Sequence, residues 1–221
     1  MSFNIAIDGP AGAGKSTIAK QLAKDLGVVY VDTGAMYRAM AYYFITNGIE
    51  AEDITKITDA CKDVVVTITY EDGVQNVWLN GENVSGKIRT EEVGKMASAT
   101  SVYPVVRKKL VELQQQLAKK TDVIMDGRDI GTVVLPNADV KIYMTASSAI
   151  RAKRRYEELT AKGIECNIKD IEKDIIDRDY RDMNRETSPL KKALDAVELD
   201  TSNLDIEGVV AAMKEIINKV R

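Results

Sequence analysis

Short apolar runs alternate with amphipathic stretches along most of the chain. The apolar runs are residues 3–8, 28–31, 123–125, 140–143 and 197–199. Short runs of this kind, rich in β-branched residues, are typical of strands in a parallel sheet that helices cover on both faces. Helices are predicted from the glycine-rich turn after residue 8 to about Leu26, from Ala35 to about Asn47, and from about Ile206, with Asp205 as its N-cap. The alternation indicates an α/β fold with a doubly wound sheet.

Two segments interrupt this alternation. In the first, residues 64–70 and 74–79 are β-type runs joined by Glu71-Asp72-Gly73, which predicts a hairpin with an Asp-Gly turn. Because a hairpin is antiparallel, we expect it to flank the parallel sheet as an insertion. The chain would then form one domain, residues 1–221, with a core (1–62 and 102–221) and an insertion (63–101).

The second segment, residues 151–186, is helical in pattern and dense in charge. It holds ten basic and ten acidic residues, including six of the chain's eleven arginines. Arginine in this density suggests planar recognition of oxyanions, although a salt-bridged, solvated helix face would show the same composition. The helical spacing puts one set of side chains on a single stripe: Arg178, Arg181, Asp182 and Arg185. Such a stripe is either structural or a clamp that closes over a transferred phosphate.

The composition removes several kinds of chemistry. The chain has no histidine, which excludes Ser-His-Asp and Cys-His catalysis and histidine-ligated zinc. Its 31 Lys and Arg residues against 34 Asp and Glu residues give a net charge of −3, which argues against a general nucleic-acid or membrane-surface binder. Cys61 and Cys166 match no metal-binding spacing, and no apolar run reaches the roughly 18 residues of a membrane span. We therefore expect a cytoplasmic protein.

The strongest motif lies between the first predicted strand and the first predicted helix. Residues 9–16, GPAGAGKS, match the phosphate-binding pattern G-x-x-x-x-G-K-[ST] at every fixed position, and Thr17 follows. Backbone N–H groups of such a loop converge on phosphate oxygens at a helix N-terminus. Lys15 would reach the β- and γ-phosphates, and the hydroxyl of Ser16 would bind Mg²⁺. The loop predicts binding of a nucleoside triphosphate, but it leaves open what happens to the γ-phosphate.

Three kinds of phosphate-loop protein compete at this point. A GTPase switch would need an N-K-x-D element, which the chain lacks, and a motor or transporter ATPase would need an apolar strand ending in Asp-Glu. A small-molecule kinase would need a second anion site that faces the loop. Arg38 and Arg128 both follow predicted strands, and ligands of open α/β sheets bind at the carboxyl ends of the strands. Two such arginines opposite Lys15 favour a kinase with a phosphorylated acceptor.

Five sequence blocks then carry a family resemblance. In chain order they are IAIDGPAGAGKST, DTGAMYR, NGENVSGKIRTEEV, DGRDIGTVVLPNADVKIYMTAS and RDYRDMNRETSPL. Together the blocks resemble bacterial-type cytidylate kinases of the nucleoside-monophosphate kinase superfamily. The resemblance implies transfer of the γ-phosphoryl group of ATP to CMP or dCMP with Mg²⁺. It also implies a five-stranded P-loop kinase sheet of order 2-3-1-4-5, a monophosphate-binding insertion and a short helical lid at residues 151–170.

The resemblance also implies roles for individual residues. The residues that match ATP contacts are Gly9, Pro10, Ala11, Gly12, Ala13, Gly14, Lys15, Ser16, Thr17 and Arg154. The residues that match CMP contacts are Thr33, Arg38, Ser98, Arg107, Arg128, Asp129, Arg178, Asp182 and Arg185. Of these, Lys15, Arg128 and Arg185 would be catalytic. We expect a monomer that binds small-molecule nucleotides, with no nucleic acid or membrane partner. Another small-molecule kinase, for UMP or a different monophosphate, and a nucleotide-dependent switch remain alternatives.

The chemistry needs no general base, because a phosphate oxygen of CMP is already an anion near neutral pH. Lys15, Arg128, Arg185 and Mg²⁺ held through Ser16 would align the groups and neutralise charge. Asp126, at the end of a predicted strand, is a candidate for ordering water ligands of Mg²⁺. The carboxylate of Asp129 would accept a hydrogen bond from the amino group of cytosine and oppose the carbonyl of uracil, which favours CMP over UMP.

Overall fold

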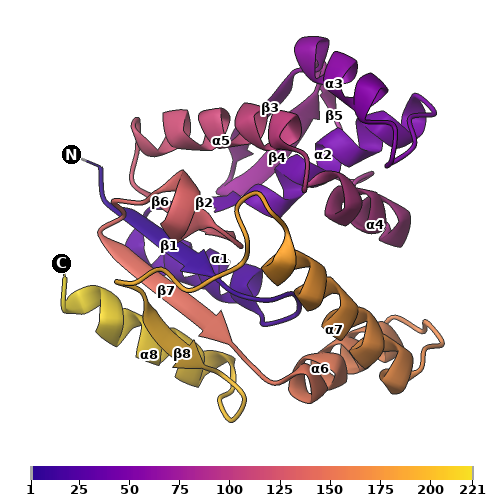
Figure 1. Cartoon of the computed structure of the whole chain (residues 1–221). Coiled ribbons are helices and arrows are strands. Elements are labelled where there is room, and N and C mark those ends of the chain that lie inside the picture. Colours follow the sequence, from indigo (N-terminus) through magenta and orange to yellow (C-terminus); the bar gives the residue numbers. More distant parts are fainter. Residues whose placement is uncertain (1, 221) are drawn as a thin grey trace. The chain divides into compact units, whose positions relative to one another are not determined.

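A computed structural model describes residues 2–220, and these divide into two compact units (Figure 1). The first unit comprises residues 28–123 together with residue 2, and the second comprises residues 3–27 and 124–220. This division does not test the prediction that residues 63–101 are an insertion into a core, which stays a prediction. No helix within the described residues is long and apolar enough to cross a membrane.

The first unit contains eight regular elements. They are β2 (Val29–Asp32), α2 (Thr33–Thr46), α3 (Ile54–Asp63), β3 (Val66–Glu71), β4 (Val74–Leu79), β5 (Glu82–Asn83), α4 (Glu91–Thr100) and α5 (Pro104–Ala118). The predicted hairpin is confirmed: β3 pairs antiparallel with β4, from Val66 opposite Leu79 to Glu71 opposite Val74. Its turn residues Asp72 and Gly73 have φ angles of 50° and 75°, as a two-residue hairpin turn requires. A third strand, β5, completes a small sheet of order β3-β4-β5.

The second unit contains the elements that carry the phosphate-binding pattern and the charge-dense segment. They are β1 (Asn4–Asp8), α1 (Lys15–Leu26), β6 (Val123–Gly127), η1 (Ile130–Val134), β7 (Val140–Thr145), α6 (Ser148–Ala161), α7 (Ile168–Asn184), β8 (Val197–Asp200) and α8 (Ile206–Asn218). β1 pairs in parallel with β7, and β7 with β8. α1 packs against α8, and α6 packs along α7 (Figure 1).

The larger sheet confirms the predicted fold class. Its five strands follow the order β2-β6-β1-β7-β8, which is 2-3-1-4-5 when these strands are numbered along the chain. All five predicted strands are present, and the predicted ends differ from the observed ones by at most two residues. The predicted N-cap of the last helix is also confirmed, because the carboxylate of Asp205 accepts a hydrogen bond from the backbone N–H of Gly208 at 2.8 Å.

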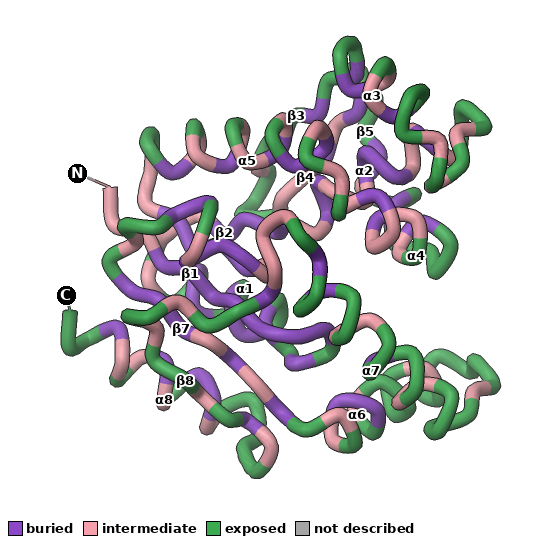
Figure 2. Tube along the Cα trace, in the orientation of Figure 1, coloured by how far each residue is buried: buried purple, intermediate pink, exposed green. Residues whose placement is uncertain are grey.

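Burial follows from the predicted patterning. β1 is buried from Ile5 to Asp8, as expected for a strand that is covered on both faces (Figure 2). On α1, Ile18 and Leu22 are buried, whereas Leu26 at the end of the helix is only half-buried. Several elements were not predicted: the helices α3, α4 and α5, the short strand β5, and a π-helical turn, η1, shortly after β6. Turns of this last kind are frequent at functional sites.

Candidate active site

The phosphate-binding loop, residues 9–14, connects β1 to the N-terminus of α1 in the second unit. Gly9 has a φ angle of 151°, and a Cβ atom there would lie 1.9 Å from the carbonyl oxygen of Met144, so only glycine fits. The side chain of Lys15 folds back over the loop. Its Nζ donates hydrogen bonds of 2.7 Å to the carbonyl oxygens of Gly9 and Pro10. The loop therefore presents both an ammonium group and the open N–H groups of a helix N-terminus.

The surroundings of Lys15 favour an anionic ligand. Lys15 is 5% exposed, and burial is the main cause that lowers its pKa well below the ordinary value. The nearby positive charge of Arg128 lowers this pKa further, whereas the carboxylates of Asp126 and Asp8 act in the opposite direction. The hydroxyl of Ser16 donates a 2.8 Å hydrogen bond to Asp126. Buried cations that repel each other in this way bind phosphate groups favourably, because the phosphate removes the repulsion.

Four charged side chains form a group that we call the arginine–aspartate cluster: Asp129, Asp182 and Arg185, which are buried, and Arg128, which is half-buried. The Nε of Arg128 donates to a carboxylate oxygen of Asp182 at 2.8 Å, and these side chains are 19% and 9% exposed. Arg185 lies 3.9 Å from Asp182 and 3.7 Å from Asp129. Burial alone would raise the pKa of Asp182, but the charge and hydrogen bond of Arg128 outweigh it and hold that pKa below its ordinary value.

The predicted stripe on α7 is only partly correct. Asp182 is buried and Arg178 is half-buried, but Arg181 is exposed, and its Nε donates to the backbone carbonyl of Asp177. Arg181 and Asp182 lie three and four positions after Arg178, and neighbouring positions of a helix point about 100° apart. One of the two can therefore face the protein while the other faces solvent. Arg185 lies beyond the last helical residue, as the C-cap, with φ −67° and ψ 141°.

The backbone beyond the helix holds Arg185 in place. Its Nε donates to the carbonyl oxygen of Ser188 at 2.6 Å. Ser188 itself has a φ of 52°, in the left-handed region, so this carbonyl is aimed by an unusual backbone conformation. The guanidinium of Arg185 is thereby oriented before any ligand binds.

Arg151 is a site residue that the sequence analysis missed. It begins the charge-dense segment, is 5% exposed, and donates hydrogen bonds to the backbone carbonyls of Ala146 at 2.8 Å and Ala11 at 2.9 Å. Its third nitrogen lies 2.7 Å from a carboxylate oxygen of Asp179. Arg151 therefore joins the phosphate-binding loop to α7. The only signal in the sequence was its membership of the arginine-rich segment.

Arg154, predicted to contact ATP, lies elsewhere on α6. Its guanidinium donates to the backbone carbonyl of Thr201 at 2.7 Å and to the hydroxyl of the same residue at 3.3 Å. Thr201 directly follows β8 and is fully buried. The structure thus places Arg154 against the segment that joins β8 to α8, and its role toward ATP stays a prediction.

Asp8 is a second residue that the sequence analysis missed. It ends β1, is 5% exposed, and accepts hydrogen bonds from the backbone N–H groups of Ile130 at 2.8 Å and Gly131 at 2.7 Å. Burial raises its pKa to about 6, and the charge of Asp129 adds to this. A carboxylate directly before the first loop glycine was the available signal.

The remaining predicted site residues belong to the first unit. Thr33 is buried at the start of α2, where the carboxylate of Asp32 caps the helix by accepting from the N–H of Ala35 at 2.9 Å. Arg89 lies 2.6 Å from the other oxygen of Asp32. The side-chain amide of Gln75 bonds both the N–H and the carbonyl of Asp32, at 2.8 and 3.2 Å. The small sheet and the segment after it thus fix the start of α2.

Arg38, Ser98 and Arg107 come from α2, α4 and α5, and α2 packs against both of the other helices. Arg107 is 3% exposed, and its guanidinium carbon lies 5.5 Å from the ring centroid of Tyr37. The hydroxyl of Ser98 is buried and has no hydrogen-bond partner within the described part of the protein. A buried hydroxyl in this state is available to a ligand.

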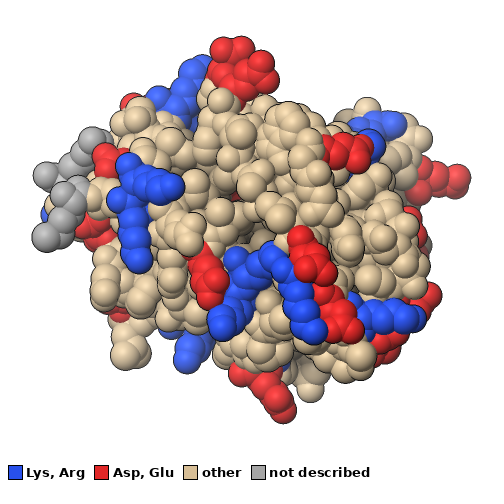
Figure 3. Space-filling view, turned by 90° about the horizontal axis from the view of Figure 1, so that it is seen from above, with Lys and Arg blue, Asp and Glu red and all other residues tan. Residues whose placement is uncertain are grey.

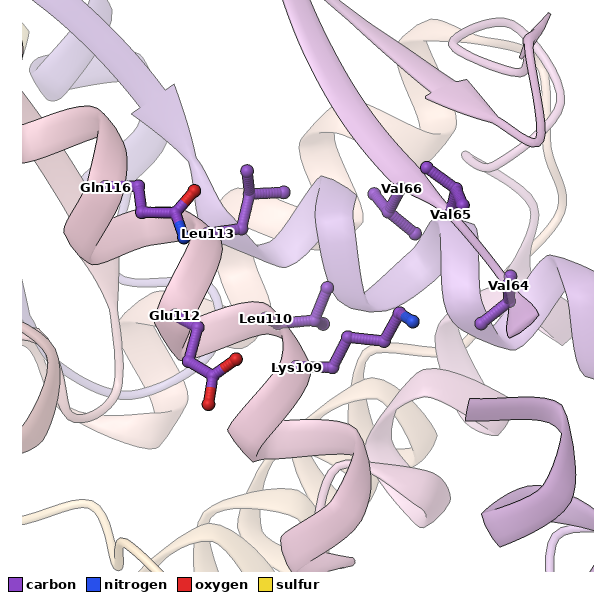
Figure 4. A pocket seen from close by; sticks show the side chains of 8 residues that line it. All are labelled: Val64, Val65, Val66, Lys109, Leu110, Glu112, Leu113 and Gln116. Atoms are coloured by element: carbon purple, nitrogen blue, oxygen red, sulfur yellow. The ribbon is translucent and has the colours of Figure 1, made fainter. Parts of the chain in front are cut away.

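Neither the charge on one face of the protein nor a cavity in the first unit points to another site. On the face shown in Figure 3, basic and acidic side chains lie beside one another instead of forming one large patch of a single sign. A cavity of about 190 Å³ in the first unit is lined by residues 64–66 and by α5 side chains between Lys109 and Gln116. Figure 4 shows these side chains. The lining of the cavity is largely aliphatic and contains none of the predicted site residues.

Comparisons with known proteins show which proteins this chain is similar to. A family model described as cytidylate kinase matches residues 5–219. A cytidylate kinase of Lactobacillus gasseri is 54% identical over 98% of this chain and 94% of that protein. One of Lactobacillus johnsonii is 53% identical over the same shares. A gluconokinase structure from Sinorhizobium meliloti, 10% identical, covers 99% of this chain and 93% of that chain with a TM-score of 0.51, which indicates a shared fold.

Proposed function

This chain belongs to the cytidylate kinase family, and we propose that Lys15, Arg128 and Arg185 carry the transfer of the γ-phosphoryl group from ATP to CMP or dCMP. The products are ADP and CDP or dCDP. One observation carries the assignment of these residues: in the second unit, Arg128 lies close enough to Lys15 for its positive charge to lower the pKa of Lys15. A buried lysine and a half-buried arginine beside a phosphate-binding loop match a reaction that moves a phosphoryl group between two phosphates.

The transfer requires alignment and charge neutralisation, and it requires no proton abstraction. A phosphate oxygen of CMP attacks the γ-phosphorus of ATP while the bond to the β-phosphate oxygen breaks, so one P–O bond replaces another. The nucleophile is already anionic, which is consistent with a chain that has no histidine. Lys15 follows the migrating group, and Arg128 and Arg185 neutralise the negative charge that spreads over its oxygens. Lys15 and Arg185 are buried, and exclusion of water from such a site limits hydrolysis of ATP.

The residues beside the loop fit a magnesium ion that arrives with ATP. The Ser16 hydroxyl and the Asp126 carboxylate are 2.8 Å apart. The hydroxyl of Ser16 would bind Mg²⁺, and the carboxylate of Asp126 would order the water ligands of the ion. Among the described residues there is no group of three or more His, Cys, Asp or Glu side chains that could hold a metal alone. Mg²⁺ bound with phosphates usually keeps several waters and needs only one or two protein ligands, so one hydroxyl with a carboxylate beside it fits the ion. When bound, the ion would neutralise charge on the β- and γ-phosphates.

The proposed nucleotide contacts follow the sequence predictions. For ATP they are residues 9–17, with Arg154 as a further contact. For CMP they are Thr33, Arg38, Ser98, Arg107, Arg128, Asp129, Arg178, Asp182 and Arg185. The buried hydroxyl of Ser98, which has no partner among the described residues, supports its assignment to the acceptor. Asp129 is the proposed reader of the cytosine amino group.

A coupled assay of ADP formation tests this function. We expect the wild-type chain to phosphorylate CMP and dCMP far better than UMP, AMP, GMP or shikimate. As a control, Lys15→Ala should remain folded by circular dichroism and lose transfer by orders of magnitude, because it removes the charge that follows the phosphoryl group. Turnover of UMP equal to that of CMP would overturn the proposed base choice, and near-normal turnover by a folded Lys15→Ala variant would overturn the mechanism.

A further inference from the structure

Asp8 is a buried acid that the mechanism above does not use. It ends β1, directly before the first glycine of the phosphate-binding loop, and it is 5% exposed. Burial raises its pKa to about 6, so the ionised form that prevails near neutral pH is unfavourable at this position. The charged groups that act on it are Asp129, which raises the pKa, and Lys15, which lowers it. A carboxylate kept at a cost in stability points to a task beyond ending a strand.

Its hydrogen bonds show where it acts. The two carboxylate oxygens accept from consecutive backbone N–H groups, those of Ile130 at 2.8 Å and Gly131 at 2.7 Å. These are the first two residues of η1. At Gly131 there is little room for a side chain, since a Cβ atom would lie 3.2 Å from the Lys141 side chain and 3.4 Å from Asp8. Asp8 therefore binds the N-terminus of η1 from a distant point in the chain.

The N-terminus of η1 is capped differently from those of other helices in the chain. Asp32, Asp53 and Asp205 each occupy an N-cap, and each uses its own carboxylate to cap its helix. Asp129 occupies the N-cap of η1, but its side chain makes no capping hydrogen bond. Asp8 supplies those acceptors in its place. The carboxylate of Asp129 can therefore point away from its own helix, where Arg185 lies 3.7 Å from it.

We propose that Asp8 is a positioning residue for base choice: by capping η1 in place of Asp129, it holds the Asp129 carboxylate in the orientation that reads the cytosine amino group. This inference rests on the proposed role of Asp129. It makes Asp8 a link between the phosphate-binding loop, which it directly precedes, and the residue that selects the acceptor base.

The test compares Asp8→Asn with a matched control, Asp139→Asn. Asparagine keeps the shape of Asp8 but turns an NH₂ group toward one of the two N–H donors, so one hydrogen bond is lost. Asp139 also accepts a backbone N–H of β1, that of Asn4 at 2.8 Å, but it is exposed and lies after the end of η1, whereas the first two N–H groups of η1 bond Asp8. Hydrogen exchange of the Ile130 and Gly131 amides reports the cap directly and needs no activity. We expect it to accelerate about tenfold in Asp8→Asn and to be unchanged in Asp139→Asn.

The second measurement is the ratio of kcat/KM for CMP to kcat/KM for UMP. We expect Asp129→Asn to lower this ratio about ten- to a hundredfold and Asp8→Asn to lower it about fivefold or more. In the double variant, Asp8→Asn should change the ratio by less than about twofold, because its effect passes through Asp129. Gly131→Ala, which crowds the same turn, should also lower the ratio.

Several results would overturn the inference. Unchanged exchange of the two amides in Asp8→Asn would show that it does not hold η1. Faster exchange with an unchanged CMP-to-UMP ratio would show that Asp8 has no role in base choice. The same would follow if Asp8→Asn lowered the ratio as much in the Asp129→Asn background as in the wild-type chain. Failure of the proposed function itself is seen separately, in the wild-type chain, as equal use of CMP and UMP.

Discussion

Two groups of ion pairs in the charge-dense segment differ in almost every physical respect except composition. On α6, Arg155 pairs with Glu158 at 2.8 Å, and the same glutamate pairs with Lys162, with all three side chains about half-exposed. At the end of α7, Asp182 and Arg185 belong to the arginine–aspartate cluster, where their side chains are 9% and 4% exposed. Both groups are arginines and acids at helical spacing, and residue types alone do not separate them.

Burial is what separates their effects. Exposed pairs are screened by water and salt and contribute about 0–1 kcal/mol. Charges in the buried group have lost their water, so each depends on its partner, and removing one leaves the other uncompensated. The same loss of water makes the field of Arg128 and Arg185 strong and fixed before a phosphate arrives. The exposed ion pairs solvate the surface of α6, whereas the arginine–aspartate cluster holds its arginines ready for a phosphate group.

Among these variants, Arg128→Ala should have the largest effect on stability and activity. It leaves the carboxylate of Asp182 buried without its closest partner, 2.8 Å away, so we expect the free energy of unfolding to fall by about 3–5 kcal/mol. We also expect kcat for CMP to fall about 10²–10³-fold, measured on the fraction that remains folded. Calorimetry should show a weaker CMP affinity and a nearly unchanged ATP affinity. A larger loss for ATP than for CMP would place Arg128 against the wrong substrate.

Asp182→Asn should make the stability of the protein less dependent on pH. The pKa of Asp182 is lowered in the folded protein, so its ionised form stabilises the fold above the ordinary value of 3.8, and this contribution is lost as the pH falls through the folded pKa. We expect the variant to be less stable than the wild type by about 1.5–3 kcal/mol at pH 7. The difference should vanish in strong acid. Denaturant unfolding at several pH values measures it, and a difference that does not change with pH would contradict the ion pair.

Arg155→Ala should have the smallest effect. Its partner Glu158 is about half-exposed, so we expect the free energy of unfolding to change by less than about 1 kcal/mol, and less still in 1 M salt. The kcat and KM values for both nucleotides should stay within about twofold of the wild type. A loss of activity comparable to that of Arg128→Ala would show that an exposed ion pair of α6 matters for activity as much as the arginine–aspartate cluster does.

The fold was largely predictable because its signals are local. The phosphate-binding loop is continuous over eight residues, and the strands and the hairpin appear as short runs whose period shows in the sequence. The π-helical turn η1 was missed, because the residues that hold its first N–H groups belong to β1, more than 120 positions earlier. Arg151 was missed for a related reason, since its partner Ala11 lies 140 positions away.

By itself, the sequence determined the α/β class, the nucleotide-binding loop and the chemistry that a chain without histidine can perform. Only the tertiary structure decided which of the many arginines lie in water and which are held against buried carboxylates. It also decided that Asp8, rather than Asp129, caps η1. The physical reason is that motif and periodicity are properties of neighbouring residues, whereas desolvation and the pairing of charges depend on what long-range packing brings together.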